Sequence, residues 1–263
     1  MQLRRAARVI LIGAPGVGKG TQTDRLLNRF SQLQSISTGD VLRRNVKNRT
    51  PLGIMAENTI KTGGLVADDL MLRLISAELR SRGWLSGPSM TLSSAATSAE
   101  PCPPAPPPPS LEAAQALHSW PVAHNDDPSA SFILDGYPRT AAQAATLDAL
   151  VPINLAVSLK TPFSVILSRI ASRWVHEPSG RVYNAAFNAP RIPGRDDITG
   201  EPLVQRADDQ EHVYRARFAR FEQASEPLLE HYARRGVLLE IEGMSSDEIS
   251  PRLYSEFQRR FAL

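Results

Sequence analysis

The sequence contains a single cysteine, Cys102, among its 263 residues. One thiol cannot form a disulfide within the chain, and a zinc site built from several thiolates is excluded as well. No run of about 18 apolar residues is present, so we expect no membrane insertion. Lys and Arg outnumber Asp and Glu by only 30 to 27, a formal charge of +3. This mild excess falls short of a nucleic-acid-binding stripe but suits phosphorylated small molecules.

The first eight residues carry Arg4, Arg5 and Arg8 and no acidic residue. This charge pattern is similar to a mitochondrial address. The apolar run at residues 9–12 follows almost at once, so a long cleavable leader does not fit before it. A basic solvated terminus is the other interpretation. The terminus agrees with a location in the mitochondrial matrix, which the family resemblance described below implies, with the cytoplasm as the alternative.

Short apolar runs alternate with helix-patterned sequence along most of the chain. Residues 9–12, Val-Ile-Leu-Ile, are typical of a buried parallel strand, and residues 21–30 carry apolar positions at helical spacing. Further strands are expected at residues 33–36, 132–134, 153–159 and 237–241. This alternation predicts an α/β fold with a parallel five-stranded sheet that helices cover on both faces.

Two segments interrupt the alternation. Residues 87–131 hold ten of the 21 prolines, and this composition predicts a disordered insertion, with docking of an SH3-like partner as the alternative. Residues 176–209 are rich in Gly, Pro and Asp and predict a small polar lid.

Residues 13–21, Gly-Ala-Pro-Gly-Val-Gly-Lys-Gly-Thr, stand between the first strand and the first helix, where a Walker A phosphate loop belongs. Its glycines let backbone N–H groups curl around phosphate oxygens, and Lys19 reaches the phosphates. Gly20 stands where Ser or Thr is expected, so Thr21 is the nearest hydroxyl for phosphate or Mg²⁺. A tight glycine-rich turn beside a solvated lysine is the competing interpretation.

Further motifs follow in order: Ser37-Thr-Gly-Asp40 with Arg43, Gly64-Leu-Val66, Asp135-Gly-Tyr-Pro-Arg-Thr140 with Gln143, and Arg206-Ala-Asp-Asp209. With the phosphate loop they resemble the adenylate kinase family nearly end to end, apart from the Pro-rich insertion. The resemblance implies a phosphotransferase that moves a phosphoryl group between a Mg²⁺–nucleoside triphosphate and AMP. It also implies a core of residues 1–36, 67–86, 132–171 and 210–263, an AMP-binding domain of residues 37–66 and a lid of residues 172–209.

The resemblance implies three sets of site residues. The set for the triphosphate donor is Gly16, Val17, Gly18, Lys19, Gly20, Thr21, Arg169, Arg173, Val182, Tyr183 and Ser245. The set for AMP is Thr38, Arg43, Gly64, Leu65, Val66, Gly136, Tyr137, Pro138, Arg139, Gln143, Arg206 and Arg217. The catalytic set is Lys19, Arg139, Arg173, Arg206 and Arg217.

Several of these residues also have a physical reason to serve. Asp135 ends an apolar run and can offer its carboxylate to hydrated Mg²⁺. Arg139 can grip two phosphate oxygens, although an arginine taken alone more often makes a surface salt bridge. Thr38 fits a helix N-cap, and Gln143 offers the donor and the acceptor that reading an adenine edge requires.

Arg169 and Arg173 are four residues apart in helix-patterned sequence. This spacing predicts that they share one helix face and converge on one anion.

The segment from Arg173 to residue 203 resembles the long lid of the family, which four cysteines and a zinc ion hold together in some relatives. Because this lid has no cysteine, the resemblance implies a hydrogen-bonded lid without zinc, held by His176, Ser179, Asp196 and Thr199.

Trp174, the run Gly-Arg-Val-Tyr-Asn at residues 180–184 and residues 236–240 are most similar to the mitochondrial, GTP-using branch of the family. We expect GTP, and also ITP, as donor, with ATP as the alternative, and a monomeric enzyme. A UMP/CMP kinase and a P-loop switch without transfer activity are competing hypotheses. The full arginine set argues against a switch, which has no use for an AMP pocket.

Overall fold

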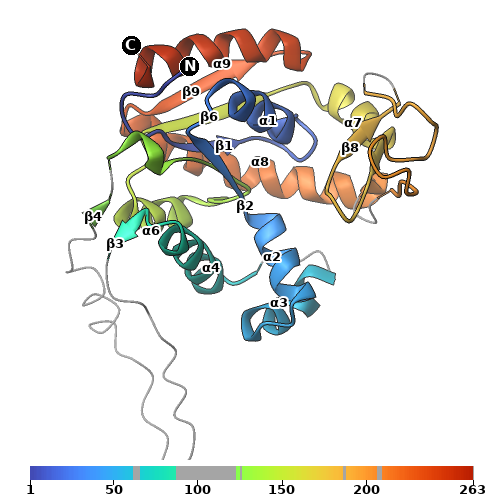
Figure 1. Ribbon diagram of the computed structural model, residues 1–263, viewed down its shortest axis with the longest axis horizontal. Coiled ribbons are helices and arrows are strands. Elements are labelled where there is room, and N and C mark those ends of the chain that lie inside the picture. Colours follow the sequence, from blue (N-terminus) through green and yellow to red (C-terminus); the bar gives the residue numbers. More distant parts are fainter. Residues whose placement is uncertain (62–65, 87–122, 125, 186–187, 206–208, 263) are drawn as a thin grey trace, which may run out of the picture.

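The computed structural model describes residues 1–61, 66–86, 123–124, 126–185, 188–205 and 209–262 (Figure 1). Its centre is a five-stranded parallel sheet with the strand order β2-β5-β1-β6-β9. The strands are β1 (Arg8–Ile12), β2 (Leu33–Ser37), β5 (Ser131–Asp135), β6 (Leu155–Lys160) and β9 (Leu238–Glu242). Each overlaps a predicted strand, so the α/β fold with five parallel strands is confirmed.

Helices cover both faces of the sheet (Figure 1). They are α1 (Lys19–Arg29), α4 (Asp68–Ser81), α6 (Ala141–Leu150), α7 (Phe163–Ala171), α8 (Glu211–Arg234) and α9 (Ser246–Phe261). Side chains of β1 alternate between two cores, with Ile10 and Ile12 in one and Val9 and Leu11 in the other. Both faces of the strand are therefore apolar, as a parallel sheet between helical layers requires. No helix among these described residues is long and apolar enough to cross a membrane.

The pair α2 (Thr38–Lys47) and α3 (Pro51–Lys61) projects away from the sheet layers (Figure 1). The two helices cross closely, because a Cβ on Gly53 would lie 2.1 Å from the Asn45 carbonyl oxygen. This pair forms most of the segment predicted to bind AMP, of which Gly64 and Leu65 lie outside the described residues.

The Pro-rich segment leaves and rejoins the fold at one point. The short strands β3 (Leu85–Ser86) and β4 (Ala123–His124) pair antiparallel, with Ser86 opposite Ala123. Residues 87–122, which contain most of the predicted insertion, lie outside the described residues.

The predicted insertion is too long at its C-terminal end, because residues 126–131 belong to the ordered core. Asp126 forms an ion pair with Arg8 at 2.6 Å, and its carbonyl accepts from the Ala6 N–H. The 3-10 helix η1 (Pro128–Ala130) follows, and the buried Ser131 opens β5 and accepts a hydrogen bond from the Ala7 N–H. Proline content alone did not reveal these contacts with the N-terminal segment.

The lid segment contains the antiparallel hairpin of β7 (Arg173–Val175) and β8 (Val182–Asn184). An isolated bridge between Val175 and Val204 closes the segment on itself, and a second bridge joins Arg195 to Pro202. The lid lies beside α7, at a distance from α3 (Figure 1).

Candidate active site

The phosphate loop connects β1 to α1 at the carboxyl edge of the sheet. Gly16 and Gly18 have φ angles of 80° and 105°, which L side chains rarely adopt. A Cβ on Gly16 would also lie 2.7 Å from the Ile170 side chain. At Gly20, by contrast, a Cβ would meet nothing within 4 Å, so its backbone position does not demand glycine. The loop thus needs glycine where the backbone turns.

Lys19 opens α1 and folds back over this loop. Its Nζ donates to the carbonyl oxygens of Gly13 and Ala14, at 2.8 and 3.1 Å. Burial lowers the pKa of the Lys19 ammonium most strongly, and the Asp135 carboxylate opposes that shift. Three guanidinium groups lower the same pKa further; they belong to Arg139, Arg217 and Arg173. These influences place three guanidinium groups within Coulombic reach of the Lys19 ammonium.

Arg139 shows the same influences as Lys19. Desolvation, followed by the Arg217 charge, lowers the pKa of the Arg139 guanidinium, and Asp135 again opposes the shift. Arg139 as a whole is nevertheless exposed, so an incoming anion can reach it. Burial raises the pKa of Tyr214 to about 12, while Arg217 and Arg173 act against that rise. A cluster of like charges is unfavourable unless an anion joins it, which marks the cluster as a candidate anion site.

The turn after β5 positions Asp135 and Arg139. Asp135 is the last residue of β5, aligned with Leu11 of β1 and Ser37 of β2. Gly136 follows with φ of 87°, and a Cβ there would lie 2.7 Å from the Thr38 hydroxyl. The Arg139 Nε donates to the Gly136 carbonyl at 2.8 Å. This turn therefore places a carboxylate and a guanidinium at the edge where the phosphate loop begins.

Thr38 serves a purpose other than the predicted N-cap. The helix α2 begins at Thr38 itself, earlier than the sequence indicated, so that Ser37 precedes the helix. The Thr38 side chain is buried, and its hydroxyl donates to the Asp135 carbonyl at 3.1 Å. It joins the start of α2 to the end of β5.

Arg169 and Arg173 do not share a helix face, and this prediction is wrong. The helix α7 ends at Ala171 with Ser172 as its C-cap, and Arg173 begins the β7–β8 hairpin. Arg169 donates to the carbonyls of Val17 and Met244, at 3.2 and 2.6 Å. The helical periodicity of the sequence continues to Arg173, but α7 ends at Ala171 because Arg173 pairs with β8.

Arg173 instead forms an ion pair with Asp209, in which its Nε donates to Oδ2 at 2.9 Å and its Nη2 donates to Oδ1. The side chains are 17% and 5% exposed. The sequence analysis included Asp209 in the Arg206-Ala-Asp-Asp209 motif but did not predict its ion pair with Arg173.

Gln143 lies in the first turn of α6 and uses both ends of its amide. Its Oε1 accepts from the Arg139 N–H at 2.6 Å, and its Nε2 donates to Asp68 Oδ1 at 2.6 Å. Thr140 caps this helix by accepting from the Gln143 N–H. Burial and the Asp68 carboxylate also raise the pKa of the nearby Tyr137 to about 12. Asp68 was not singled out from the sequence, because no local signal links it to a residue 75 positions away.

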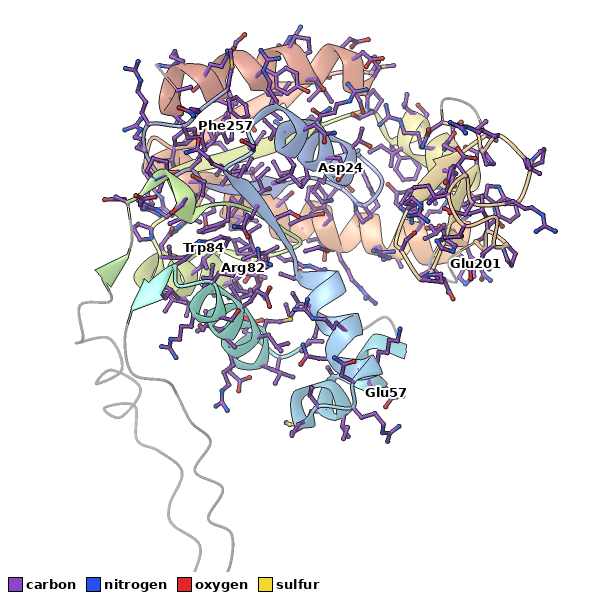
Figure 2. The ribbon with its side chains drawn as sticks, viewed as in Figure 1. Asp24, Glu57, Arg82, Trp84, Glu201 and Phe257 are labelled. Carbon is purple, nitrogen blue, oxygen red and sulfur yellow. The ribbon has the colours of Figure 1, made fainter. Side chains whose placement is uncertain are left out.

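The four predicted lid residues form one hydrogen-bonded network. His176, which is 1% exposed, contacts the Ser179 hydroxyl at 2.7 Å and the Thr199 hydroxyl at 3.3 Å. The Thr199 hydroxyl in turn donates to Asp196 at 3.0 Å. Glu201, labelled in Figure 2, approaches His176 Nε2 at 2.6 Å and was missed from the sequence, although it stands two residues after Thr199.

Arg181 and Tyr183 complete this network around Asp196. Arg181 forms a two-pronged ion pair with Asp196, at 2.7 and 2.6 Å, and the Tyr183 hydroxyl donates to the same carboxylate at 2.9 Å. Arg181 is the largest cause that holds the pKa of Asp196 well below its ordinary range. Tyr183 is buried while Val182 is exposed, so the Tyr183 side chain packs in the lid interior. Its place on the donor side stays a prediction.

Two more side chains brace the phosphate loop and were not predicted. The buried Tyr214 of α8 donates its hydroxyl to the Pro15 carbonyl at 3.1 Å. Gln22 of α1 contacts the Ser246 carbonyl and the Ser250 hydroxyl, which ties the loop helix to α9. Ser245, a predicted donor residue, is the N-cap of α9 and accepts from the Glu248 N–H.

Some predicted residues cannot be placed in this arrangement. Gly64, Leu65 and Arg206 lie outside the described residues, as does the side chain of Arg43. Val66 is half-buried and packs against the core. Thr21 is exposed on the first turn of α1.

Comparison with known proteins gives matches along the chain. The family model described as "Adenylate kinase" matches residues 11–87, and the model "Adenylate kinase, active site lid" matches residues 173–208. A protein named "GTP:AMP phosphotransferase, mitochondrial" from Saccharomyces cerevisiae is 40% identical over 264 residues, covering 98% of this chain and 95% of that protein. Proteins of the same name from S. cerevisiae strain S288c and from Drosophila melanogaster are 41% and 34% identical. Each comparison spans 94% of this chain, and 94% and 93% of those proteins.

Proposed function

The chain belongs to the adenylate kinase family of nucleoside monophosphate kinases, and from this premise we propose that it transfers the γ-phosphoryl group of a Mg²⁺–nucleoside triphosphate to AMP, with GTP preferred over ATP and ITP also accepted. The observation that supports this proposal is the group of four cations at the carboxyl edge of the sheet. The charges of Arg139, Arg173 and Arg217, together with that of Asp135, all shift the pKa of Lys19. Two nucleotides that meet at their phosphates supply the negative charge that such a group favours.

The transfer is in-line. An oxygen of the AMP phosphate attacks the γ-phosphorus while the bond from that phosphorus to the β–γ bridging oxygen breaks, giving ADP and GDP. No covalent enzyme intermediate and no dedicated general base are needed, because position and charge supply most of the catalysis. Lys19 leaves the Gly13 and Ala14 carbonyls for the β- and γ-phosphates. The arginines, Arg206 among them, stabilise the charge on the transferring group.

Mg²⁺ enters as part of the donor and supplies neutralisation of the phosphate charge. The described residues contain no group of three or more His, Cys, Asp or Glu side chains that could hold a metal ion. Mg²⁺ commonly binds through one or two carboxylates, waters and substrate phosphates, and Asp135 beside Lys19 fits that pattern. In this proposal Asp135 would hold the hydrated ion through water, and the Thr21 hydroxyl, on the first turn of α1, would be the second protein oxygen available to it.

AMP lies on the other side of Asp135. We assign its phosphate to Arg139, Arg43, Arg206 and Arg217, and its adenine to Gln143. The turn of residues 136–138, residues 64–66 and Thr38 enclose the nucleotide. The support is that Thr38, Gly136 and Arg139 are contiguous and that α2 starts at this edge.

The donor side is formed by the phosphate loop, Arg169, Arg173, Val182, Tyr183 and Ser245. Arg169 supports this because it joins Val17 of the loop to Met244, next to Ser245. The preference for GTP rests on the relatives named above and on the similarity of Trp174 and its neighbours to the GTP-using branch of the family. The mitochondrial matrix location rests on the names of the same relatives and on the basic first eight residues. The monomeric state stays a prediction.

A matrix of donors and acceptors tests the function. Purified protein is given GTP, ITP or ATP with AMP, CMP or UMP, and product diphosphates are separated and counted. We expect turnover with AMP alone among the acceptors, and the highest kcat/KM with GTP. Turnover on UMP and CMP without AMP would make it a pyrimidine nucleotide kinase. Binding of nucleotide without transfer to any acceptor would make it a switch.

A further inference from the structure

Asp68 has no hydrogen bond or ion pair with Lys19, Arg139, Arg173 or Arg217 among the described contacts, yet it holds the side chain proposed to read adenine. It is the first residue of α4, and its Oδ1 accepts from Gln143 Nε2 at 2.6 Å. The opposite end of the same amide accepts from the Arg139 N–H, also at 2.6 Å. Gln143 is 5% exposed, so the surrounding protein confines its amide to this position.

These two contacts fix which end of the amide is oxygen and which is nitrogen. A carboxylate can only accept, so the atom of Gln143 that faces Asp68 has to be the nitrogen. A backbone N–H can only donate, so the atom that faces Arg139 has to be the oxygen. Rotation of the amide by 180° would place oxygen against carboxylate and N–H against N–H, which makes two hydrogen bonds into two repulsions.

After these contacts the amide has one donor hydrogen on Nε2 and one acceptor lone pair on Oε1 left. Adenine presents a complementary pair on its Watson–Crick edge, the acceptor N1 and the donor amino group at C6. Hypoxanthine presents the reverse pair, an N1–H donor and an acceptor oxygen at C6. The orientation that suits adenine therefore opposes a donor to a donor and an acceptor to an acceptor when hypoxanthine takes its place.

We propose that Asp68 is a specificity-determining positioning residue, which locks the Gln143 amide in the orientation that accepts AMP and rejects IMP. This inference rests on the proposed function, since it assumes that Gln143 faces the acceptor base. The position of Gln143 at the start of α6 accounts for its contact with the Arg139 N–H, one residue before the N-cap Thr140. It does not explain the contact with Asp68, which comes from a different helix.

The test compares Asp68→Asn with Asp69→Asn. Both substitutions remove one negative charge from the first turn of α4, so they change the helix dipole interaction alike. Asp69 is 70% exposed at its side chain and approaches only Arg73, at 3.8 Å, among the ion pairs of the described residues. Asn at position 68 can turn either end of its own amide to Gln143, so it no longer forbids the reversed orientation.

The readout is the ratio of kcat/KM for AMP to kcat/KM for IMP, with the better of Mg-GTP and Mg-ATP as donor. Because the Arg139 N–H remains, we expect this ratio to fall about fivefold in Asp68→Asn, mainly through a higher KM for AMP. It should stay unchanged in Asp69→Asn. The ratio refers to folded enzyme only, so a loss of stability in either variant leaves it unaffected.

An unchanged ratio in Asp68→Asn, with normal wild-type turnover of AMP, would overturn this inference and leave the proposed function standing. Equal falls in both variants would also overturn it, since the cause would then be charge at the helix end. Wild-type protein that does not phosphorylate AMP would overturn the proposed function and, with it, this inference.

Discussion

Charged side chains are concentrated both in the lid and at the edge of the sheet beside the phosphate loop, here called the phosphate edge. The lid pairs side chains of opposite charge, whereas the phosphate edge brings side chains of like charge together. In the lid, Asp196 receives bonds from Arg181, Tyr183 and two backbone N–H groups, and Glu201 meets His176. At the phosphate edge, after burial, the charges of Arg139, Arg217 and Arg173 lower the pKa of Lys19, and the Arg217 charge lowers that of Arg139. A cluster that satisfies itself holds a structure together, whereas a cluster of like charges is suited to an anion that has yet to arrive. Function should therefore depend less steeply on the lid than on the phosphate edge.

The largest effect is expected at Lys19. Lys19→Ala removes the ammonium that reaches the donor phosphates, so kcat should fall by about 10³-fold or more. The melting temperature should stay the same or rise, because a buried cation among cations is lost. Lys160→Ala is the matched control; that lysine is half-exposed and pairs with Glu240 on the surface. Steady-state kinetics and thermal unfolding measure both, and wild-type kcat in Lys19→Ala would remove the assignment of the phosphate loop.

Arg217 should follow with a smaller loss. Arg217→Ala takes one guanidinium from the group around Asp135, and kcat/KM for AMP should fall by about 10²- to 10³-fold. Arg220→Ala changes an exposed arginine of the same helix and should leave kcat/KM unchanged. Similar losses in both variants would mean that the general positive field of α8, and not a placed arginine, accounts for the activity.

The lid should respond in stability more than in chemistry. Asp196→Asn weakens the charge-assisted bonds to Arg181, so lid amides should exchange with deuterium about tenfold faster, while kcat falls by less. Asp197→Asn, next in sequence and exposed, is the control. If kcat collapsed in Asp196→Asn while lid exchange stayed slow, the contrast between the two regions would fail.

The lowered pKa of Asp196 also predicts how the stability of the lid depends on pH. Because the folded state holds the pKa of Asp196 below its ordinary value of about 3.9, its stabilising contribution is fully present above that pH and is lost as pH falls below it. Lid exchange in the wild type should therefore rise steeply only in strong acid. In Asp196→Asn that part of the rise should be missing.

The smallest effect is expected from the Pro-rich segment. Since Ser86 lies opposite Ala123, a two-residue Asn-Gly turn can replace residues 87–122 and keep β3 paired with β4. Melting temperature and kcat should both match the full chain. A deletion extended through residue 130 removes Asp126 and η1 and should lower the melting temperature, because the contacts of Asp126 with Arg8 and Ala6 are lost. Loss of activity in the shorter deletion would give residues 87–122 a functional role.

These regions also differ in how far the sequence predicted them. The strands and the phosphate loop were predicted from local patterns. A β-branched run favours a strand, and a glycine allows a positive φ, whatever residues lie further away in the sequence. The lid set of His176, Ser179, Asp196 and Thr199 was found by resemblance, and its hydrogen bonds are now observed. Contacts between distant segments were not predictable, such as those of Asp68 with Gln143 and of Tyr214 with Pro15. Periodicity misplaced Arg173 on a helix because strand pairing, a tertiary effect, decides where α7 ends.

The most direct measurement is a crystal structure with a bisubstrate analogue, guanosine joined to adenosine through five phosphates. The account predicts that Lys19, Arg139, Arg173 and Arg217 all contact the phosphate chain, with the adenosine base at Gln143. A phosphate chain bound elsewhere, with these four side chains directed into solvent, would contradict it.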